Sequence, residues 1–153
     1  MLGDRRYCYP LTVTDFSSRF LICCEAMEST REQMAITAFE RLFKEFGLPD
    51  AIRSDNGVPF SSPHAIHGLS KLSVYWLRLG IAIERIKPGN PQQNAYVERF
   101  NRTVRYEWLS QYYWKDLEEV QLFATNWMWS YNHDRPNMAL GGFTPKQHLA
   151  MAA

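Results

Sequence analysis

The sequence lacks long apolar runs, and this absence excludes a large class of proteins. Among its 153 residues, no apolar stretch reaches the roughly 20 residues that a membrane-spanning helix needs. The N-terminus also lacks the hydrophobic segment of a signal peptide. We therefore expect a cytoplasmic protein with no membrane partner.

Cysteine and net charge are also scarce. The three cysteines, Cys8, Cys23 and Cys24, include no Cys-x-x-Cys pair, so neither a disulfide framework nor a cysteine-rich zinc site is expected. We interpret them as reduced, apolar strand residues. The formal net charge is only +1, so the overall charge does not indicate a nucleic-acid partner. Evidence for DNA binding has to come from where the charged residues lie.

Apolar residues, by contrast, are abundant and are spaced for a folded α/β domain. They make up 46% of the chain, and aromatic residues make up 14%, which is typical of a globular core. The predicted elements are strands at 7–15, 19–25, 51–54 and 81–86 and helices at 29–46, 69–79, 93–110 and 117–131. Ser29 and Glu32 have the spacing of a capping box at the start of the first helix. Strands separated by helices indicate a mixed sheet with helices on its faces.

One acidic residue lies where a predicted strand ends. Asp55 directly follows the strand at 51–54. Ligands bind at such strand ends in α/β sheets, because the strand fixes the side chain while the loop stays open to solvent. Asp55-Asn56-Gly57 is also an ordinary turn sequence, so the tripeptide alone favours a structural role over a functional one.

A second acidic residue, Glu98, lies on the predicted helix that follows a Pro-Gly-Asn-Pro loop. Arg102 and Arg105 follow it at i+4 and i+7 and share its face, while Asn94 and Asn101 flank it. Such a face can be a solvated helix surface held by Glu–Arg pairs. It also fits a metal-binding carboxylate beside arginines that bind a phosphate backbone.

Carboxylates of this kind suit phosphoryl transfer between oxygens. The reaction is promoted by two Mg²⁺ or Mn²⁺ ions about 3.5–4 Å apart that neutralise charge on the attacking and leaving oxygens, and carboxylates hold them. Asp55 and Glu98 are the two candidate ligands. Spacing alone indicates no third.

Six segments, in chain order, carry a resemblance to one family. They are Pro10–Asp15 (PLTVTD), Ser18–Phe20 (SRF), Ile52–Gly57 (IRSDNG), Pro88–Asn101 (PGNPQQNAYVERFN), Tyr131–Pro136 (YNHDRP) and Gly141–Pro145 (GGFTP). Together they resemble bacterial insertion-sequence transposases, which share the retroviral-integrase core and its ribonuclease-H-like fold. The resemblance covers nearly the whole chain. It implies a partial integrase catalytic core over residues 1–132 and the C-terminal tail motif of that core over residues 133–153.

The resemblance also implies roles for the candidate residues. Asp55 would be the family's second catalytic Asp and Glu98 its catalytic Glu, both holding Mg²⁺ or Mn²⁺ in a two-ion site. The side chains of Asn94, Asn101, Arg102 and Arg105 would bind DNA near the ions. The expected partners are transposon ends, target DNA and further subunits in a homo-oligomer. The expected reaction is DNA strand cleavage followed by strand transfer.

One departure from the family pattern concerns the first catalytic Asp. In the family it lies on the first, central strand, just upstream of a turn that corresponds to Gly3-Asp4. Asp4 belongs to the turn and Asp15 to the hairpin, so neither replaces it. We therefore expect a ribonuclease-H-like mixed sheet that lacks its first, central strand, with the gap left open or bridged by another strand. Our hypothesis is that the chain is a truncated or misassigned reading frame.

These features are compatible with three functions. The first is a metal-dependent transposase core that is inactive as this isolated chain, because one metal carboxylate is missing. The second is a non-catalytic remnant that binds DNA or a transposase partner. The third is a ribonuclease-H-type nuclease unrelated to transposition, against which the tail motif after Tyr131 argues.

Overall fold

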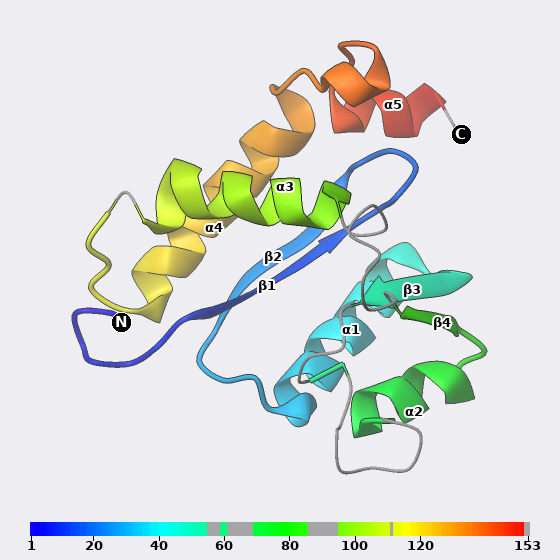
Figure 1. Cartoon of the computed structure of the whole chain (residues 1–153), viewed down its shortest axis with the longest axis horizontal. Coiled ribbons are helices and arrows are strands. Elements are labelled where there is room, and N and C mark those ends of the chain that lie inside the picture. The colour runs from blue at the N-terminus through cyan, green and yellow to red at the C-terminus, as the bar shows by residue number, and fades with distance from the viewer. Residues whose placement is uncertain (55–58, 61–68, 86–94, 111, 152–153) are drawn as a thin grey trace. The chain divides into compact units, whose positions relative to one another are not determined.

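The structure, a computed structural model, describes residues 1–54, 59–60, 69–85, 95–110 and 112–151, with the backbone alone at 95–98. The elements are β1 (Tyr9–Thr14), β2 (Leu21–Met27), α1 (Glu32–Phe46), β3 (Ala51–Ser54), α2 (Lys71–Arg78), β4 (Ala82–Arg85), α3 (Ala95–Val104), η3 (Arg105–Leu109), α4 (Leu117–His133), η4 (Met138–Leu140) and α5 (Pro145–Met151) (Figure 1). They divide into two compact units, residues 1–29 with 114–153 and residues 30–113. Within the described ranges, no helix has the length and apolar character needed to cross a membrane.

The first unit begins with the predicted hairpin. β1 and β2 pair antiparallel, with Thr12 opposite Cys24. The turn between them is closed at Asp15, whose N–H donates to the Phe20 carbonyl at 2.9 Å and whose side chain accepts from the Ser18 N–H at 2.9 Å. The predicted turn at 16–18 is therefore confirmed, and β2 extends two residues beyond its predicted end.

Two side-chain amides of α4 bind the edge of β2 that faces away from β1. Asn132 is buried; its Oδ1 accepts from the Leu21 N–H at 2.7 Å and its Nδ2 donates to the Leu21 carbonyl at 2.9 Å. Gln121 Oε1 accepts from the Ala26 N–H at 2.7 Å, and its Nε2 donates to the Cys24 carbonyl at 3.2 Å. α4 thereby supplies the hydrogen bonds that a neighbouring strand would make. The buried apolar residues of β2 and α4 are Leu21, Cys23, Cys24, Met27, Val120, Ala124 and Tyr131.

The three cysteines are free, as expected. Cys23 and Cys24 are buried in β2, whereas Cys8 precedes β1 and is half-buried, so the prediction of a strand position was wrong for Cys8. Burial raises the pKa of Cys24 to about 12 and also raises the pKa of Cys8. Both are therefore protonated thiols at neutral pH.

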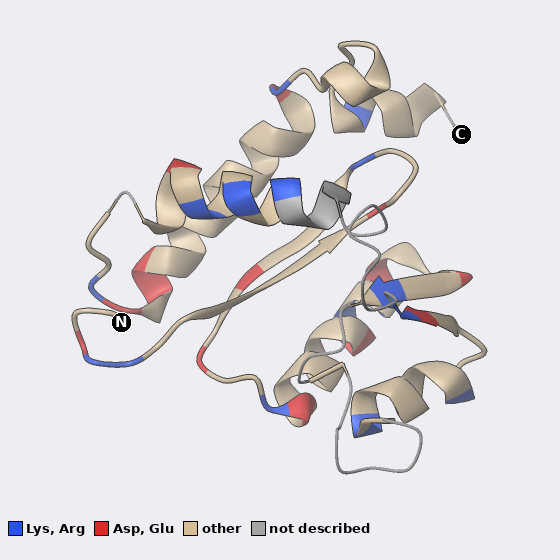
Figure 2. Cartoon of the chain, in the orientation of Figure 1, with Lys and Arg blue, Asp and Glu red and all other residues tan. Residues whose placement is uncertain are grey.

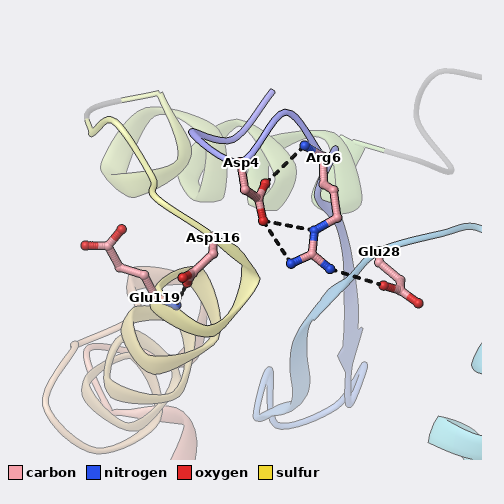
Figure 3. Close-up of polar contacts among 5 residues, drawn as sticks. All are labelled: Asp4, Arg6, Glu28, Asp116 and Glu119. Atoms are coloured by element: carbon pink, nitrogen blue, oxygen red, sulfur yellow. Dashed lines mark hydrogen bonds and ion pairs between the residues drawn. The ribbon is translucent and has the colours of Figure 1, made fainter.

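The segment before β1 is attached to the start of α4. The Gly3 N–H donates to the Trp114 carbonyl at 2.7 Å, and the Asp4 N–H donates to the Lys115 carbonyl at 3.0 Å. A Cβ on Gly3 would lie 3.2 Å from the Lys115 carbonyl oxygen, so this close approach favours glycine. Arg6 connects the Asp4 carboxylate, at 2.9 Å, to Glu28, at 3.8 Å (Figure 3).

Side-chain caps begin the helices of this unit. The Asp116 side chain accepts from the Glu119 N–H at 3.0 Å at the start of α4 (Figure 3). Thr144 and Gln147 form a reciprocal capping box at the start of α5: the Gln147 N–H donates to Thr144 Oγ1 at 3.2 Å, and the Thr144 N–H donates to Gln147 Oε1 at 2.9 Å. With Pro145 at the first helical position, this explains the local sequence Thr-Pro-x-Gln.

In the second unit, β3 and β4 pair in parallel, with Ser54 opposite Arg85. Helices α1 and α2 pack through aromatic rings. The ring centroids of Phe39 and Trp76 lie 5.0 Å apart in an edge-to-face arrangement, and Phe60 stacks on the same indole at 6.1 Å. The apolar residues buried in α1, α2 and the start of the β4 segment are Ala35, Ala38, Phe39, Leu42, Leu72, Trp76 and Ile81.

Three local predictions for this unit need correction. Ser29 does not cap α1, which begins at Glu32 after an N-cap Arg31 that makes no side-chain cap bond. Glu32 instead accepts from the Lys71 N–H at 3.2 Å, so its carboxylate serves another helix. The predicted helix at 29–46 does end at Phe46, but this residue is 49% exposed although its spacing from Leu42 matches that of the buried face. Residues 95–109 are helical as predicted, but the last turn is a π-helix.

The described strands form two separate two-stranded sheets, β1–β2 and β3–β4.

We predict that Asn132→Ala lowers the free energy of unfolding by about 2–4 kcal/mol, because it leaves the buried N–H and carbonyl of Leu21 without partners. Asn126→Ala, at an exposed position of the same helix, is the matched control and should change it by less than about 0.5 kcal/mol. Urea unfolding monitored by circular dichroism measures both. Equal losses for the two variants would contradict the role assigned to Asn132.

Candidate active site

The carboxyl ends of β3 and β4 lie at one edge of their parallel sheet. Ser54 is the last residue of β3 and is 8% exposed, and Arg85 is the last residue of β4. Arg85 Nη2 donates to Ser73 Oγ in α2 at 2.8 Å, and Nη1 lies 3.4 Å from Ser54 Oγ. One guanidinium thus connects both strand ends to the first turn of α2.

Two predicted site residues adjoin this edge in the sequence but lie outside the described residues. Asp55 directly follows Ser54, and Asn94 lies in the segment after Arg85. Glu98 is placed as a backbone position in the first half of α3, while its side chain lies outside the described part. Among the residues that are described, no group of three or more His, Cys, Asp and Glu side chains is arranged to hold a metal ion.

The remaining predicted residues lie on one exposed surface of α3 and η3. Asn101, Arg102 and Arg105 are all exposed, and Figure 2 shows the basic positions along this helix. Arg99, which the sequence interpretation did not assign to DNA, is exposed as well. The opposite surface is buried through Phe100, Val104 and Trp108, spaced four residues apart. The helix is therefore amphipathic, with its basic side available to a ligand.

The change to π-helix occurs at Arg105. The Ser110 N–H donates to the Arg105 carbonyl at 2.9 Å, and Ser110 Oγ donates to the same oxygen at 2.8 Å. Since Arg105 is the first residue of this turn, the α-helical spacing from Glu98 through Arg102 is unaffected.

Asp4 lies in a turn, as expected, whereas Asp15, expected at the end of the strand at 7–15, follows β1 and has partners in the hairpin turn. Asp4 accepts from the Arg6 N–H and side chain, and the backbone hydrogen bond is the main cause that lowers the pKa of Asp4. Asp15 accepts from the N–H and the hydroxyl of Ser18. Both carboxylates close turns in the first unit.

Comparison with known families places the chain. The model of the integrase core domain family matches residues 1–91, more than half of the chain, and a second integrase core domain model matches residues 79–145. The chain belongs to the integrase core family. The integrase core is supported by bacterial relatives as well as by family models, which confirms the resemblance to insertion-sequence transposases.

Two bacterial proteins illustrate this relationship. The insertion element IS407 uncharacterized 31.7 kDa protein of Burkholderia multivorans is 31% identical over 113 residues, which are 74% of this chain and 38% of that protein. The insertion element IS476 uncharacterized 39.2 kDa protein of Xanthomonas euvesicatoria is 34% identical over 105 residues, which are 68% of this chain and 28% of that protein. The matches with this integrase core chain thus span less than two fifths of either relative.

A solved structure supports the fold. The catalytic core domain of BIV integrase matches with a TM-score of 0.63 at 18% identity, over 95% of this chain and 93% of that chain. The predicted ribonuclease-H-like mixed α/β fold is confirmed by this likeness.

The sequence interpretation missed the hydrogen-bonded group of Ser54, Ser73 and Arg85. Its members are far apart in sequence, and only Ser54 lies in a segment that carries the family resemblance. The available signal was positional: Arg85 ends a short strand immediately before the Pro-Gly-Asn-Pro loop, as Ser54 ends a strand immediately before Asp55.

Proposed function

We propose that this integrase core is the catalytic part of a transposase that cleaves DNA strands and transfers them to target DNA with divalent metal ions. The observation that carries the proposal is the match of integrase core models across residues 1–145, with Asp55 directly after β3 and Glu98 in α3. DNA integration and transposition are supported at the level of the family.

Asp55 and Glu98 are proposed to be metal ligands. Both offer carboxylate oxygens, which are the donors that Mg²⁺ and Mn²⁺ prefer. A bound pair of such ions would stabilise negative charge on the attacking and leaving oxygens. Asp55 follows a strand that is fixed by pairing with β4, and Glu98 is held on a helix, so the protein would position both carboxylates before DNA arrives.

The third carboxylate of such a site is proposed to come from another part of the whole transposase. Asp4 and Asp15 close turns and are hydrogen-bonded there. The matches with this chain span 38% and 28% of the two bacterial relatives. The proposed third metal ligand can therefore belong to a part of the transposase outside the matched region.

The DNA is proposed to bind along the exposed side of α3 and η3. Arg102 and Arg105 present guanidinium groups that can bind phosphate oxygens in pairs, and Asn101 offers an amide beside them. Asn94 is proposed to act with them close to Glu98. Phosphate contacts of this kind orient the DNA without reading its sequence. Transposon ends and target DNA are the proposed partners, and a homo-oligomer is the proposed assembly.

We predict that Asp55→Asn and Glu98→Gln each lower Mn²⁺-dependent nicking and strand transfer by at least about 100-fold, a loss of about 2.7 kcal/mol of transition-state stabilisation. The assay uses labelled transposon-end DNA, with this chain and with a version extended upstream to the length of its relatives. Asp50→Asn, at an exposed position just before β3, is the matched control and should retain activity. Full activity in both Asp55→Asn and Glu98→Gln would refute the proposed chemistry. DNA binding without activity in every version would favour the non-catalytic remnant.

We predict that Arg102→Gln and Arg105→Gln weaken binding to any duplex sequence and each reduce the dependence of log Kd on log salt concentration by about 1, because each removes one phosphate contact. Fluorescence anisotropy at several salt concentrations measures this slope. Arg78→Gln, at an exposed position of α2, should leave it unchanged. Slopes equal to that of the unmodified protein would place the DNA elsewhere.

A further inference from the structure

We infer that Arg85 is a positioning residue, which fixes the end of β3, the strand that leads in sequence directly to the proposed metal ligand Asp55. The inference rests on the proposed function of Asp55 as a metal ligand. Arg85 spans three elements, because it ends β4, donates to Ser73 in α2 and approaches Ser54 at the end of β3. Asp55 is the next residue along the chain after Ser54.

The hydrogen bonds around Ser73 explain why a donor group such as the Arg85 guanidinium lies beside its hydroxyl. Ser73 Oγ donates to the Phe60 carbonyl at 2.6 Å, and this uses its one hydrogen. Ser70 Oγ, 3.0 Å away, must therefore donate to Ser73 Oγ while it accepts from the Ser73 N–H at 3.1 Å. Arg85 supplies the second donor to Ser73 Oγ, at 2.8 Å. The hydroxyl thus makes every hydrogen bond available to it.

Because these hydroxyls are buried, each of them needs protein partners for its hydrogen bonds. Ser73 is 0% exposed, and Ser70 is also buried. A buried hydroxyl that loses a donor cannot recover it from water, so the position of Arg85 is coupled to the packing of α2. A guanidinium has several N–H donors in one plane, so it can donate hydrogen bonds to two hydroxyls on different elements at once. An ammonium or an amide does this less well.

The strands themselves offer little alternative support. β3 and β4 have four residues each, so few backbone hydrogen bonds hold their ends. The ion pair between Arg53 and Glu84, at 3.0 Å, also joins the two strands, but both side chains are largely exposed and such pairs contribute little. The contacts of Arg85, which is half-buried and reaches the buried hydroxyls of Ser54 and Ser73, are therefore the stronger constraint on the strand ends. Metal ligands tolerate only small displacements, so a loosened end of β3 would weaken the site.

The test measures Mn²⁺ binding, by electron paramagnetic resonance of free Mn²⁺, in the upstream-extended protein. Arg85→Gln should weaken Mn²⁺ binding by about tenfold or more, as loss of residues that support metal ligands commonly does. Arg85→Lys, which can reach only one hydroxyl, should give a smaller loss. Ser73→Ala should weaken binding too, and combining it with Arg85→Gln should add little, because Arg85→Gln already removes the Arg85–Ser73 contact. Arg53→Gln, the same substitution on the same pair of strands, is the matched control and should leave Mn²⁺ affinity unchanged.

Unfolding by urea separates positioning from stability alone. If Arg85 only stabilised the fold, Arg85→Gln would shift the unfolding midpoint while the folded protein kept its Mn²⁺ affinity, and the inference would be wrong. If Asp55→Asn weakens Mn²⁺ binding but Arg85→Gln and Arg85→Lys behave like Arg53→Gln, the positioning role is wrong and the proposed function stands. If the unmodified protein binds no Mn²⁺, or Asp55→Asn binds it equally well, the metal-dependent function fails and the inference with it.

Discussion

The hydrogen bonds between the α4 amides and the edge of β2 are the constraint on which the first unit depends. A two-stranded hairpin is marginal by itself, because each strand leaves one edge of backbone groups without partners. Asn132 and Gln121 satisfy that edge at two points separated by about three turns of one helix. A side-chain amide carries donor and acceptor groups in the same arrangement as a peptide group, so it can replace a neighbouring strand residue. The helix and the strand consequently fix each other's register.

In the second unit, an arginine side chain provides the additional hydrogen bonds that hold a short pair of strands. Its strands are shorter, and their carboxyl ends are tied to α2 by Arg85 and two serine hydroxyls instead of by amides. In both units, a polar side chain remote in sequence fixes a strand where backbone pairing is short. The two units differ in the segment to which the fixed strand leads. β2 leads into a connection to α1, whereas β3 leads directly to Asp55, so only in the second unit does the fixing of a strand bear on the proposed chemistry.

The parts of this fold that depend on local sequence were predictable. β3 was predicted at its observed bounds because the turn residues Asp55-Asn56-Gly57 follow it at once, and the hairpin turn was predicted from a polar stretch between two apolar runs. The capping box at Ser29 failed because the candidate partner, Glu32, binds the N–H of Lys71 instead, a contact that depends on the packing of two helices. The π-helical turn at Arg105 likewise reflects no local residue preference. Ser54, Ser73 and Arg85 were missed because only the fold brings them together.

The segments that identify the family therefore combine residues with different physical tasks. Asn132, in the tail segment, binds the backbone of Leu21 from 111 positions away, and Thr144 caps α5; both stabilise the first unit and neither needs to meet DNA. Asp55 and Glu98 are expected to act on the reaction directly, and Arg102 on the DNA. A chain could keep the first group and its fold while losing the second, because Asn132 binds the backbone of Leu21 and Thr144 pairs with Gln147. Similarity of sequence across this chain thus establishes the integrase core, whereas the proposed catalysis would depend on a few carboxylates, of which Asp55 directly follows the end of β3 and Glu98 lies on α3.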